Sequence, residues 1–299
     1  MAEAFCKVSP DIELCYETFG DPGDPTLLLI MGLATQMIGW SDDFCRELAG
    51  RGFHVVRFDN RDIGRSTHLK AKPPSIWQIA ARSKSAASYT LEDMADDAAG
   101  LLRELNLAPA HVVGASMGGM IAQALAIRHP EMVLSLTSIM STTGNPWVGR
   151  AELRLTPLLL ARRPSEREEA IDRAVKLFGV IGSKGFEQDT EHLREVAALS
   201  LDRGRGDLAG QARQLAAIRA SGDRTRALHR LKVPTVVIHG TVDPLIKPSG
   251  GRATARAIPG ARLVEIDGMG HDLPRGAWPR ILDEIESNVR RAEPARQPA

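Results

Sequence analysis

The 299-residue sequence holds only three cysteines, and its positive and negative charges almost cancel. Cys6, Cys15 and Cys45 are an odd number and lack the paired spacing of a zinc site, so we expect reduced thiols and no disulfide framework. The 38 Lys and Arg residues against 37 Asp and Glu residues give a formal net charge of +1. Such a balance provides no general attraction for nucleic acid or for an anionic membrane surface, so neither is an expected partner.

Long apolar runs and a leader pattern are also missing. The longest apolar stretch, residues 27–40, is interrupted by Gly, Thr and Gln and is too short to span a bilayer. The first residues show no basic region followed by an apolar run, so we expect no signal peptide. Together with the reduced cysteines, these absences predict a cytoplasmic globular protein. Its 43% of apolar residues suffice for a large core, and a chain of this class is most often an enzyme.

Patterns typical of strands and helices alternate along the first half of the sequence. Residues 12–16 alternate in strand fashion before a Gly- and Pro-rich turn, which suggests an antiparallel start. Ser41 and Thr90 are each expected to cap a helix. Four further strands are predicted, at residues 26–31, 53–58, 111–113 and 132–140. The first is a continuous apolar run, which suits a strand that helices bury on both faces. This alternation predicts an α/β fold with a mostly parallel, doubly wound sheet.

The alternation stops after the fourth of these runs and resumes with a predicted strand at residues 233–239. The segment between has helical patterns and no convincing strand. The simplest organisation is one α/β core, residues 1–144 and 224–299, with an inserted helical cap or lid, residues 145–223. The cap is rich in arginines that either contact an acidic or phosphorylated substrate or, more simply, form a solvated helical face: Arg150, Arg154, Arg162, Arg163, Arg167 and Arg173.

The strongest local signal is the pentapeptide from Gly114 to Gly118, with Ser116 at its centre. It follows a predicted buried strand and opens a predicted helix, which is the setting of a nucleophile elbow. The two glycines let strand and helix approach closely while the serine takes a strained backbone that exposes its hydroxyl. The helix N-terminus also favours a developing negative charge nearby. Ser116 is therefore the candidate nucleophile.

A serine hydroxyl is a poor nucleophile until a base takes its proton, and the base needs an acid to orient it. His271 lies in a Gly-rich loop directly after a predicted strand, whereas His239, for example, falls within a strand and is expected to be structural. Asp243 follows the predicted strand 233–239. Because the carboxyl ends of parallel strands share one edge of a sheet, we expect Ser116, Asp243 and His271 to meet there.

A tetrahedral oxyanion has to be held by preorganised backbone N–H groups. Met117 directly follows the candidate nucleophile and can supply one N–H group. The second is expected from Leu33, in the loop after the first buried strand, where Gly32 permits the turn and lies beside the substrate. Met37 and Trp40 are predicted to line the acyl pocket, although such residues are more often plain core.

Several segments resemble one group of proteins over nearly the whole chain. The chain is similar to the α/β-hydrolase fold superfamily and, within it, to aclacinomycin methylesterase-like hydrolases, through residues 19–22, 28–32, 39–40, 57–67 and 268–271. The resemblance implies a serine esterase with a helical cap and no cofactor. Many superfamily members have His-Gly where Met31-Gly32 stands here, and Arg-Gly where Arg61-Asp62 stands. The second difference places Asp62 near the expected pocket mouth.

The implied reaction is hydrolysis of a small-molecule carboxylic ester through an acyl-enzyme. A cofactor-free perhydrolase or haloperoxidase, an acyltransferase and a non-catalytic ligand receptor remain alternatives on the same fold. A metal hydrolase is disfavoured, because the sequence has no H-E-x-x-H and no paired-cysteine motif. Dinucleotide binding is disfavoured because Ser116 occupies the position of the second glycine in G-x-G-x-x-G.

Overall fold

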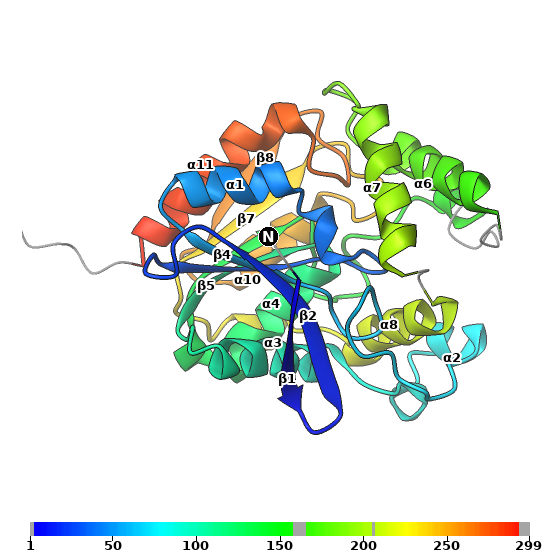
Figure 1. The fold of residues 1–299 in the computed structure, drawn as a ribbon, viewed down its shortest axis with the longest axis horizontal. Helices are drawn as coiled ribbons and strands as arrows, with labels where there is room; N and C mark the ends of the chain where they lie inside the picture. Colours follow the sequence, from blue (N-terminus) through cyan, green and yellow to red (C-terminus); the bar gives the residue numbers. More distant parts are fainter. Residues whose placement is uncertain (1–2, 158–165, 205–206, 293–299) are drawn as a thin grey trace, which may run out of the picture.

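Eight strands form one mixed sheet in the computed structural model, which describes residues 3–157, 166–204 and 207–292 (Figure 1). They are β1 (Ala4–Ser9), β2 (Ile12–Phe19), β3 (Thr26–Ile30), β4 (His54–Phe58), β5 (Ala110–Ala115), β6 (Val133–Ile139), β7 (Thr235–Gly240) and β8 (Arg262–Ile266). Their order across the sheet is β1-β2-β4-β3-β5-β6-β7-β8. Only the pairs β1–β2 and β2–β4 are antiparallel, so the predicted mostly parallel, doubly wound sheet is confirmed.

Helices cover both faces of this sheet (Figure 1). The helices of the core are α1 (Asp42–Gly50), α3 (Leu91–Glu104), α4 (Met117–Arg128), α10 (Ser249–Ala257) and α11 (Trp278–Arg290). Because side chains alternate along a strand, Leu27 and Leu29 of β3 pack in the apolar cluster that includes α1 and α11. Leu28 and Ile30 pack in the other cluster, with α3 and α4. Burial on both faces explains why this strand is apolar at every position.

A helical insert separates β6 from β7. It contains α6 (Arg167–Ile181), α7 (Thr190–Arg203) and α8 (Leu208–Ser221), and the short α9 (Thr225–Leu228) leads back to the core. In Figure 1, α6, α7 and α8 lie together on the right, beyond one end of the sheet. Helix α6 packs on α7, and α8 packs on the short α2 (Ile76–Ala80). The inserted helical cap is thus present, while its predicted limits, residues 145–223, stay a prediction.

Both residues that were predicted to cap a helix do so in the structure. The Ser41 hydroxyl accepts a hydrogen bond from the N–H of Phe44 at the start of α1, and Thr90 forms a capping box with Asp93 at the start of α3.

Strand β1 and helix α2 were not predicted. Phe5 of β1 is half exposed, so this strand lacks a clean alternation of apolar and polar residues. Helix α2 has only five residues, which is too short for an apolar period to show.

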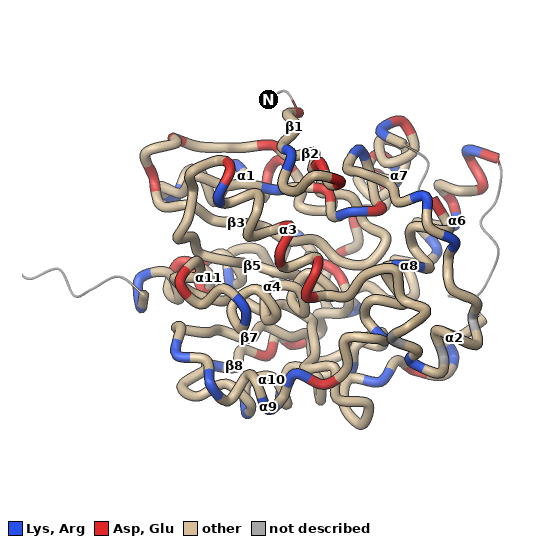
Figure 2. Tube along the Cα trace, turned by 90° about the horizontal axis from the view of Figure 1, so that it is seen from below, with Lys and Arg blue, Asp and Glu red and all other residues tan. Residues whose placement is uncertain are grey.

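Charged residues of both signs are spread along the whole trace in Figure 2. This distribution agrees with the near-zero net charge. Within the described ranges, no helix is both long enough and apolar enough to cross a membrane. The same ranges contain no group of three or more His, Cys, Asp or Glu side chains arranged to hold a metal ion.

Candidate active site

Ser116 lies in a sharp turn between β5 and α4. Its φ of 56° and ψ of −119° form a conformation that residues other than glycine rarely adopt. A Cβ at Gly114 would lie only 2.2 Å from the carbonyl oxygen of Gly118, and one at Gly118 would lie 2.0 Å from that of Ile30. Strand, turn and helix are therefore in backbone contact, and the turn requires glycine at both positions, as the motif predicts.

Three loops at the carboxyl edge of the sheet bring the candidate catalytic side chains together. His271 Nε2 lies 2.9 Å from Ser116 Oγ, although the two residues are 155 positions apart in the chain. His271 Nδ1 lies 2.7 Å from Asp243 Oδ2. Hydroxyl, imidazole and carboxylate thus form one continuous hydrogen-bonded line after β5, β8 and β7. The imidazole and the carboxylate are buried, with 7% and 3% of their residues' surface exposed.

Asp243 is held as an anion by its surroundings. Its Oδ1 accepts the backbone N–H groups of Leu245 at 2.8 Å and Ile246 at 2.9 Å, while Oδ2 faces His271. Burial by itself raises the pKa of Asp243, but the nearby His271 charge and the hydrogen bonds from His239 and His271 outweigh it and lower the pKa to about 2. The carboxylate can therefore orient and stabilise a protonated imidazole at neutral pH.

A second histidine supports the same carboxylate. His239 Nε2 lies 2.7 Å from the carbonyl oxygen of Ile246 and 3.5 Å from Asp243 Oδ2. Because a carbonyl oxygen only accepts, Nε2 carries the proton. The sequence interpretation assigned His239 a structural place in a strand. The position of His239 near the end of the strand, four residues before Asp243, could have indicated this contact.

The loop after β3, residues 31–36 and here called the β3 loop, reaches the candidate nucleophile. A Cβ at Gly32 would lie 3.1 Å from Ser116 Cβ and 3.6 Å from its Oγ. Within the described ranges, neither the Leu33 nor the Met117 backbone N–H donates a hydrogen bond to another residue. The assignment of Leu33 and Met117 as oxyanion donors stays a prediction that these unused N–H groups are compatible with.

Comparison with known proteins gives relatives that match across almost the full chain. Rhodomycin D methylesterase DauP from Streptomyces sp. (strain C5) is 30% identical over 302 residues, which cover 94% of this chain and 96% of that protein. Residues 25–167 also match the family described as alpha/beta hydrolase fold. The chain belongs to the α/β hydrolase family. The resemblance to methylesterases of this family, inferred from the sequence, is confirmed.

Two enol-lactonases are also similar to this α/β hydrolase. 3-Oxoadipate enol-lactonase 2 from Acinetobacter baylyi (strain ATCC 33305 / BD413 / ADP1) is 27% identical over 250 residues, or 81% of this chain and 80% of that protein. The crystal structure of the enol-lactonase from Burkholderia xenovorans LB400 superimposes with a TM-score of 0.69 at 26% identity, covering 96% of this chain and 98% of that one. The fold is therefore shared with this enol-lactonase over nearly the whole chain.

The cap of this α/β hydrolase is bound to the loop that carries His271. The loop, residues 267–272, donates the His271 N–H to the carbonyl oxygen of Ile181 at 2.8 Å. Ser183 accepts the N–H of Gly270 at 2.9 Å and donates its own hydroxyl to Asp272 at 2.5 Å. These contacts place the end of α6 directly on the histidine loop, and nothing in the sequence pattern indicated them.

Two residues predicted to line the acyl pocket are packed in the interior instead. Met37 and Trp40 have no exposed surface. The Trp40 ring stacks on Phe44 with centroids 5.5 Å apart, and Met37 packs in a cluster with Cys15 and Ile38. Full burial leaves neither side chain any surface for a ligand. Both serve packing in this structure.

Asp62 does not face an open pocket mouth, because its side chain is fully buried. Its two carboxylate oxygens bind Arg213 of α8 at 2.7 and 2.8 Å, and they also accept the Tyr89 hydroxyl and the Leu69 N–H. Burial raises the pKa of Asp62, but the hydrogen bonds from Arg213, Leu69 and Tyr89 and the Arg213 charge lower it overall. Asp62 therefore joins the core to the cap.

The exposed arginines of the cap fit the solvated-face interpretation. Arg154 and Arg167 form ion pairs with neighbouring carboxylates at exposed sites. Arg150 lies 4.9 Å from the centre of an exposed indole ring. Surface pairs of this kind contribute little energy and are already satisfied, so they do not indicate an acidic substrate. Arg162 and Arg163 lie outside the described residues.

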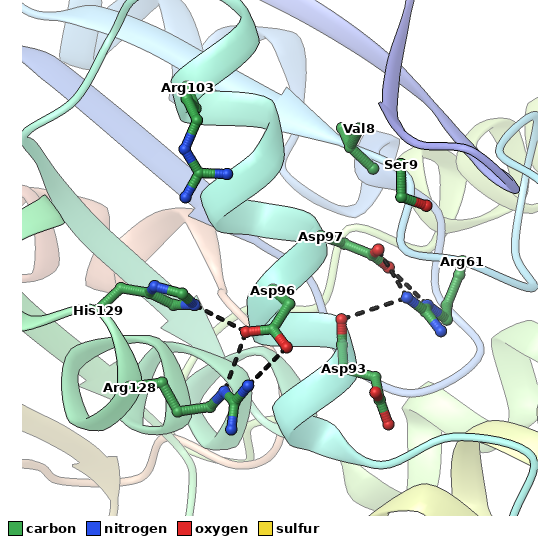
Figure 3. Close-up of a pocket in the computed structure, with 9 residues that line it drawn as sticks. All are labelled: Val8, Ser9, Arg61, Asp93, Asp96, Asp97, Arg103, Arg128 and His129. Carbon is green, nitrogen blue, oxygen red and sulfur yellow. Dashed lines mark hydrogen bonds and ion pairs between the residues drawn. The ribbon is translucent and has the colours of Figure 1, made fainter.

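A cavity of about 400 Å³ opens beside α3 and α4 (Figure 3). None of the proposed site residues lines it. Two of its carboxylates are paired, Asp96 with Arg128 and His129 and Asp97 with Arg61 (Figure 3). Since Ser116, Asp243 and His271 all lie elsewhere, we assign this cavity no part in the chemistry.

Proposed function

We propose that this α/β hydrolase is a serine esterase that cleaves a carboxylic ester through an acyl-enzyme on Ser116. The observation that carries the proposal is the line from Ser116 Oγ to His271 Nε2 and from His271 Nδ1 to Asp243 Oδ2, at 2.9 and 2.7 Å. A serine, an imidazole and a buried carboxylate in this order are the parts that nucleophilic acyl transfer needs.

In the proposed mechanism, His271 takes the proton of Ser116 as the serine oxygen attacks the ester carbonyl carbon. The carbonyl oxygen becomes an oxyanion, held by the Leu33 and Met117 N–H groups. His271 then gives the proton to the leaving alcohol, and the acyl group stays on Ser116. Water, deprotonated by His271, attacks the acyl-enzyme and releases the acid. Throughout, Asp243 orients the imidazole and stabilises its cation.

The substrate class follows from the relatives and from the packing at the serine. A methylesterase cleaves a methyl ester and an enol-lactonase a cyclic ester, so both act on the carbon–oxygen bond of a carboxylic ester. We extend this class to the present chain, with a methyl ester of a small molecule as its most specific form. Gly32 lies against Ser116, so the substrate carbonyl would sit over a residue without a side chain. No cofactor takes part, and residues 145–223 would cover the substrate as the cap.

The test is a panel of methyl, ethyl and aryl esters and a lactone, measured with the wild type and with Ser116→Ala. The proposal predicts saturable hydrolysis of at least one ester, and a loss of about a thousandfold or more in Ser116→Ala with the fold intact by circular dichroism. Peroxide-dependent halogenation, partition of the acyl group to an added alcohol, or tight binding without turnover would each favour one of the alternative activities. Hydrolysis at the wild-type rate by Ser116→Ala would overturn the proposal.

A further inference from the structure

We propose that Gln214, a cap residue on α8, is a positioning residue for the proposed oxyanion hole. This inference rests on the proposed esterase function and adds a role for the cap beyond covering the substrate. It states that the cap holds the β3 loop in the shape that aims the Leu33 N–H at the substrate.

Gln214 connects two segments of the core. Its Oε1 accepts the backbone N–H of Ala34 at 3.0 Å, across 180 positions of sequence. Its Nε2 donates to the carbonyl oxygen of Arg61 at 2.8 Å. The side chain is fully buried. Since one partner only donates and the other only accepts, the amide has one orientation in which both bonds form.

The bond to Ala34 fixes the peptide next to the proposed oxyanion donor. The peptide between Leu33 and Ala34 has its N–H held by Gln214, and its carbonyl oxygen accepts the Thr35 hydroxyl at 3.2 Å. Ala34 has a φ of 58°, in the left-handed region that residues with a side chain avoid. A conformation of this kind persists only when its surroundings hold it, and Gln214 supplies the hydrogen bond to Ala34 itself from outside the loop.

The helix that carries Gln214 is itself fixed to the core. The preceding residue, Arg213, makes the buried pair with Asp62, whose side-chain oxygens lie 2.7 and 2.8 Å from the guanidinium. One turn earlier, a Cβ at Gly210 would lie 2.5 Å from the Asp62 carbonyl oxygen, so backbone packs on backbone there. Gln214 therefore acts from a rigid support, and the oxyanion hole is complete only with α8 in place.

The experiment compares two substitutions at Gln214 with a control on the same helix. Gln214→Met keeps the length of the side chain and removes both hydrogen bonds, whereas Gln214→Glu retains an acceptor for Ala34. Ser221→Ala is the control, because the Ser221 hydroxyl accepts the Leu91 N–H at 2.8 Å and so joins α8 to the core away from the β3 loop.

Gln214→Met is expected to lower kcat by about tenfold to a hundredfold, less than the loss typical of deleting an oxyanion donor, with KM within about threefold of the wild type. Binding of a trifluoromethyl ketone, whose adduct with the serine carries an oxyanion, should weaken by the same factor as kcat/KM. Gln214→Glu should recover part of kcat, and Ser221→Ala should retain it.

Amide hydrogen exchange provides a readout that does not depend on catalysis. The inference predicts faster exchange in peptides covering residues 31–36 for Gln214→Met and unchanged exchange there for Ser221→Ala. Wild-type kcat in Gln214→Met, or an equal loss of kcat in both variants, would overturn the positioning role. If wild-type protein cleaves no ester, the proposed function fails, and the exchange result then decides alone whether Gln214 holds the loop.

Discussion

Asp62 and Arg213 are 151 positions apart in the sequence and form a two-bond ion pair between the core and α8 of the cap. Their side chains have 0% and 1% of their surface exposed. Tyr89 and the Leu69 N–H supply the remaining hydrogen bonds to the carboxylate. A pair this deeply buried is costly to break, because the partner left behind keeps a charge without water.

Asp62→Asn is expected to destabilise the protein by on the order of 3 kcal/mol near neutral pH, since it leaves the Arg213 charge without its main partner. The pKa of Asp62 is lowered in the folded state, so its contribution is present above the unfolded carboxyl pKa of about 4 and is lost as pH falls through the folded value. Urea unfolding should therefore show the gap between wild type and variant closing below about pH 4.

Asp202→Asn serves as the control for that prediction. Asp202 pairs with Arg167 at an exposed site, so its loss should leave the unfolding midpoint unchanged. If the difference in unfolding free energy between wild type and Asp62→Asn stayed constant from neutral pH to below about pH 4, the lowered pKa of Asp62 would not contribute to stability.

Asp243→Asn should reduce kcat by about ten-thousandfold while leaving the fold intact, because an amide no longer stabilises the imidazolium and favours the wrong tautomer of His271. Asp267→Asn is the matched control at the same edge of the sheet, where Asp267 accepts the Thr241 hydroxyl at an exposed site and does not contact His271 in the hydrogen bonds of the described residues. Steady-state hydrolysis of the best ester measures both. Equal activity in the two variants would remove Asp243 from the mechanism.

The ionisation of Asp243 can be followed directly. Its pKa is lowered to about 2, so its stabilising contribution is complete above the unfolded value of about 4 and declines only as pH falls from there toward the folded value. The carboxyl ¹³C chemical shift of Asp243 should therefore stay constant from neutral pH down to about pH 4. A titration midpoint above that pH would show that His271 does not hold the carboxylate as described.

Gly114→Ala and Gly118→Ala are each expected to destabilise the fold by on the order of 3 kcal/mol, since the added Cβ would overlap a backbone oxygen at 2.2 or 2.0 Å. Gly50→Ala provides the control. A Cβ at Gly50, the last residue of α1, meets nothing within 4 Å, so alanine there should be neutral or slightly stabilising. Thermal unfolding compares the three variants. Wild-type stability in Gly114→Ala would mean that strand and helix are not in contact.

The sheet could be predicted because its central strand β3 is a continuous apolar run and strand-like segments recur along the chain. The candidate triad could be predicted because each of its members follows a predicted strand, including the partly exposed β8 before His271. Parallel strands end at one edge, so Ser116, Asp243 and His271 had to approach one another. The spacing of the pentapeptide around Ser116 also predicted that the turn needs glycine at positions 114 and 118.

Contacts between distant segments could not be predicted in the same way. An arginine in a helical pattern indicates a solvated face, and only the folded chain shows that Arg213 is buried against Asp62. Met37 and Trp40 illustrate the same limit for apolar residues, because the sequence does not tell a pocket wall from the core. The place of Gln214 between Ala34 and Arg61 depends on how the cap docks, which no local pattern encodes.

The measurement closest to the central claim is the site of reaction with a fluorophosphonate, which phosphonylates a serine only when a base activates it. Mass spectrometry of the labelled wild type should place a single adduct on Ser116. The adduct should disappear in Ser116→Ala and form far more slowly in His271→Ala, with the fold of both variants intact. An adduct on another serine, or labelling of His271→Ala at the wild-type rate, would contradict the assignment of Ser116 and His271 as nucleophile and base.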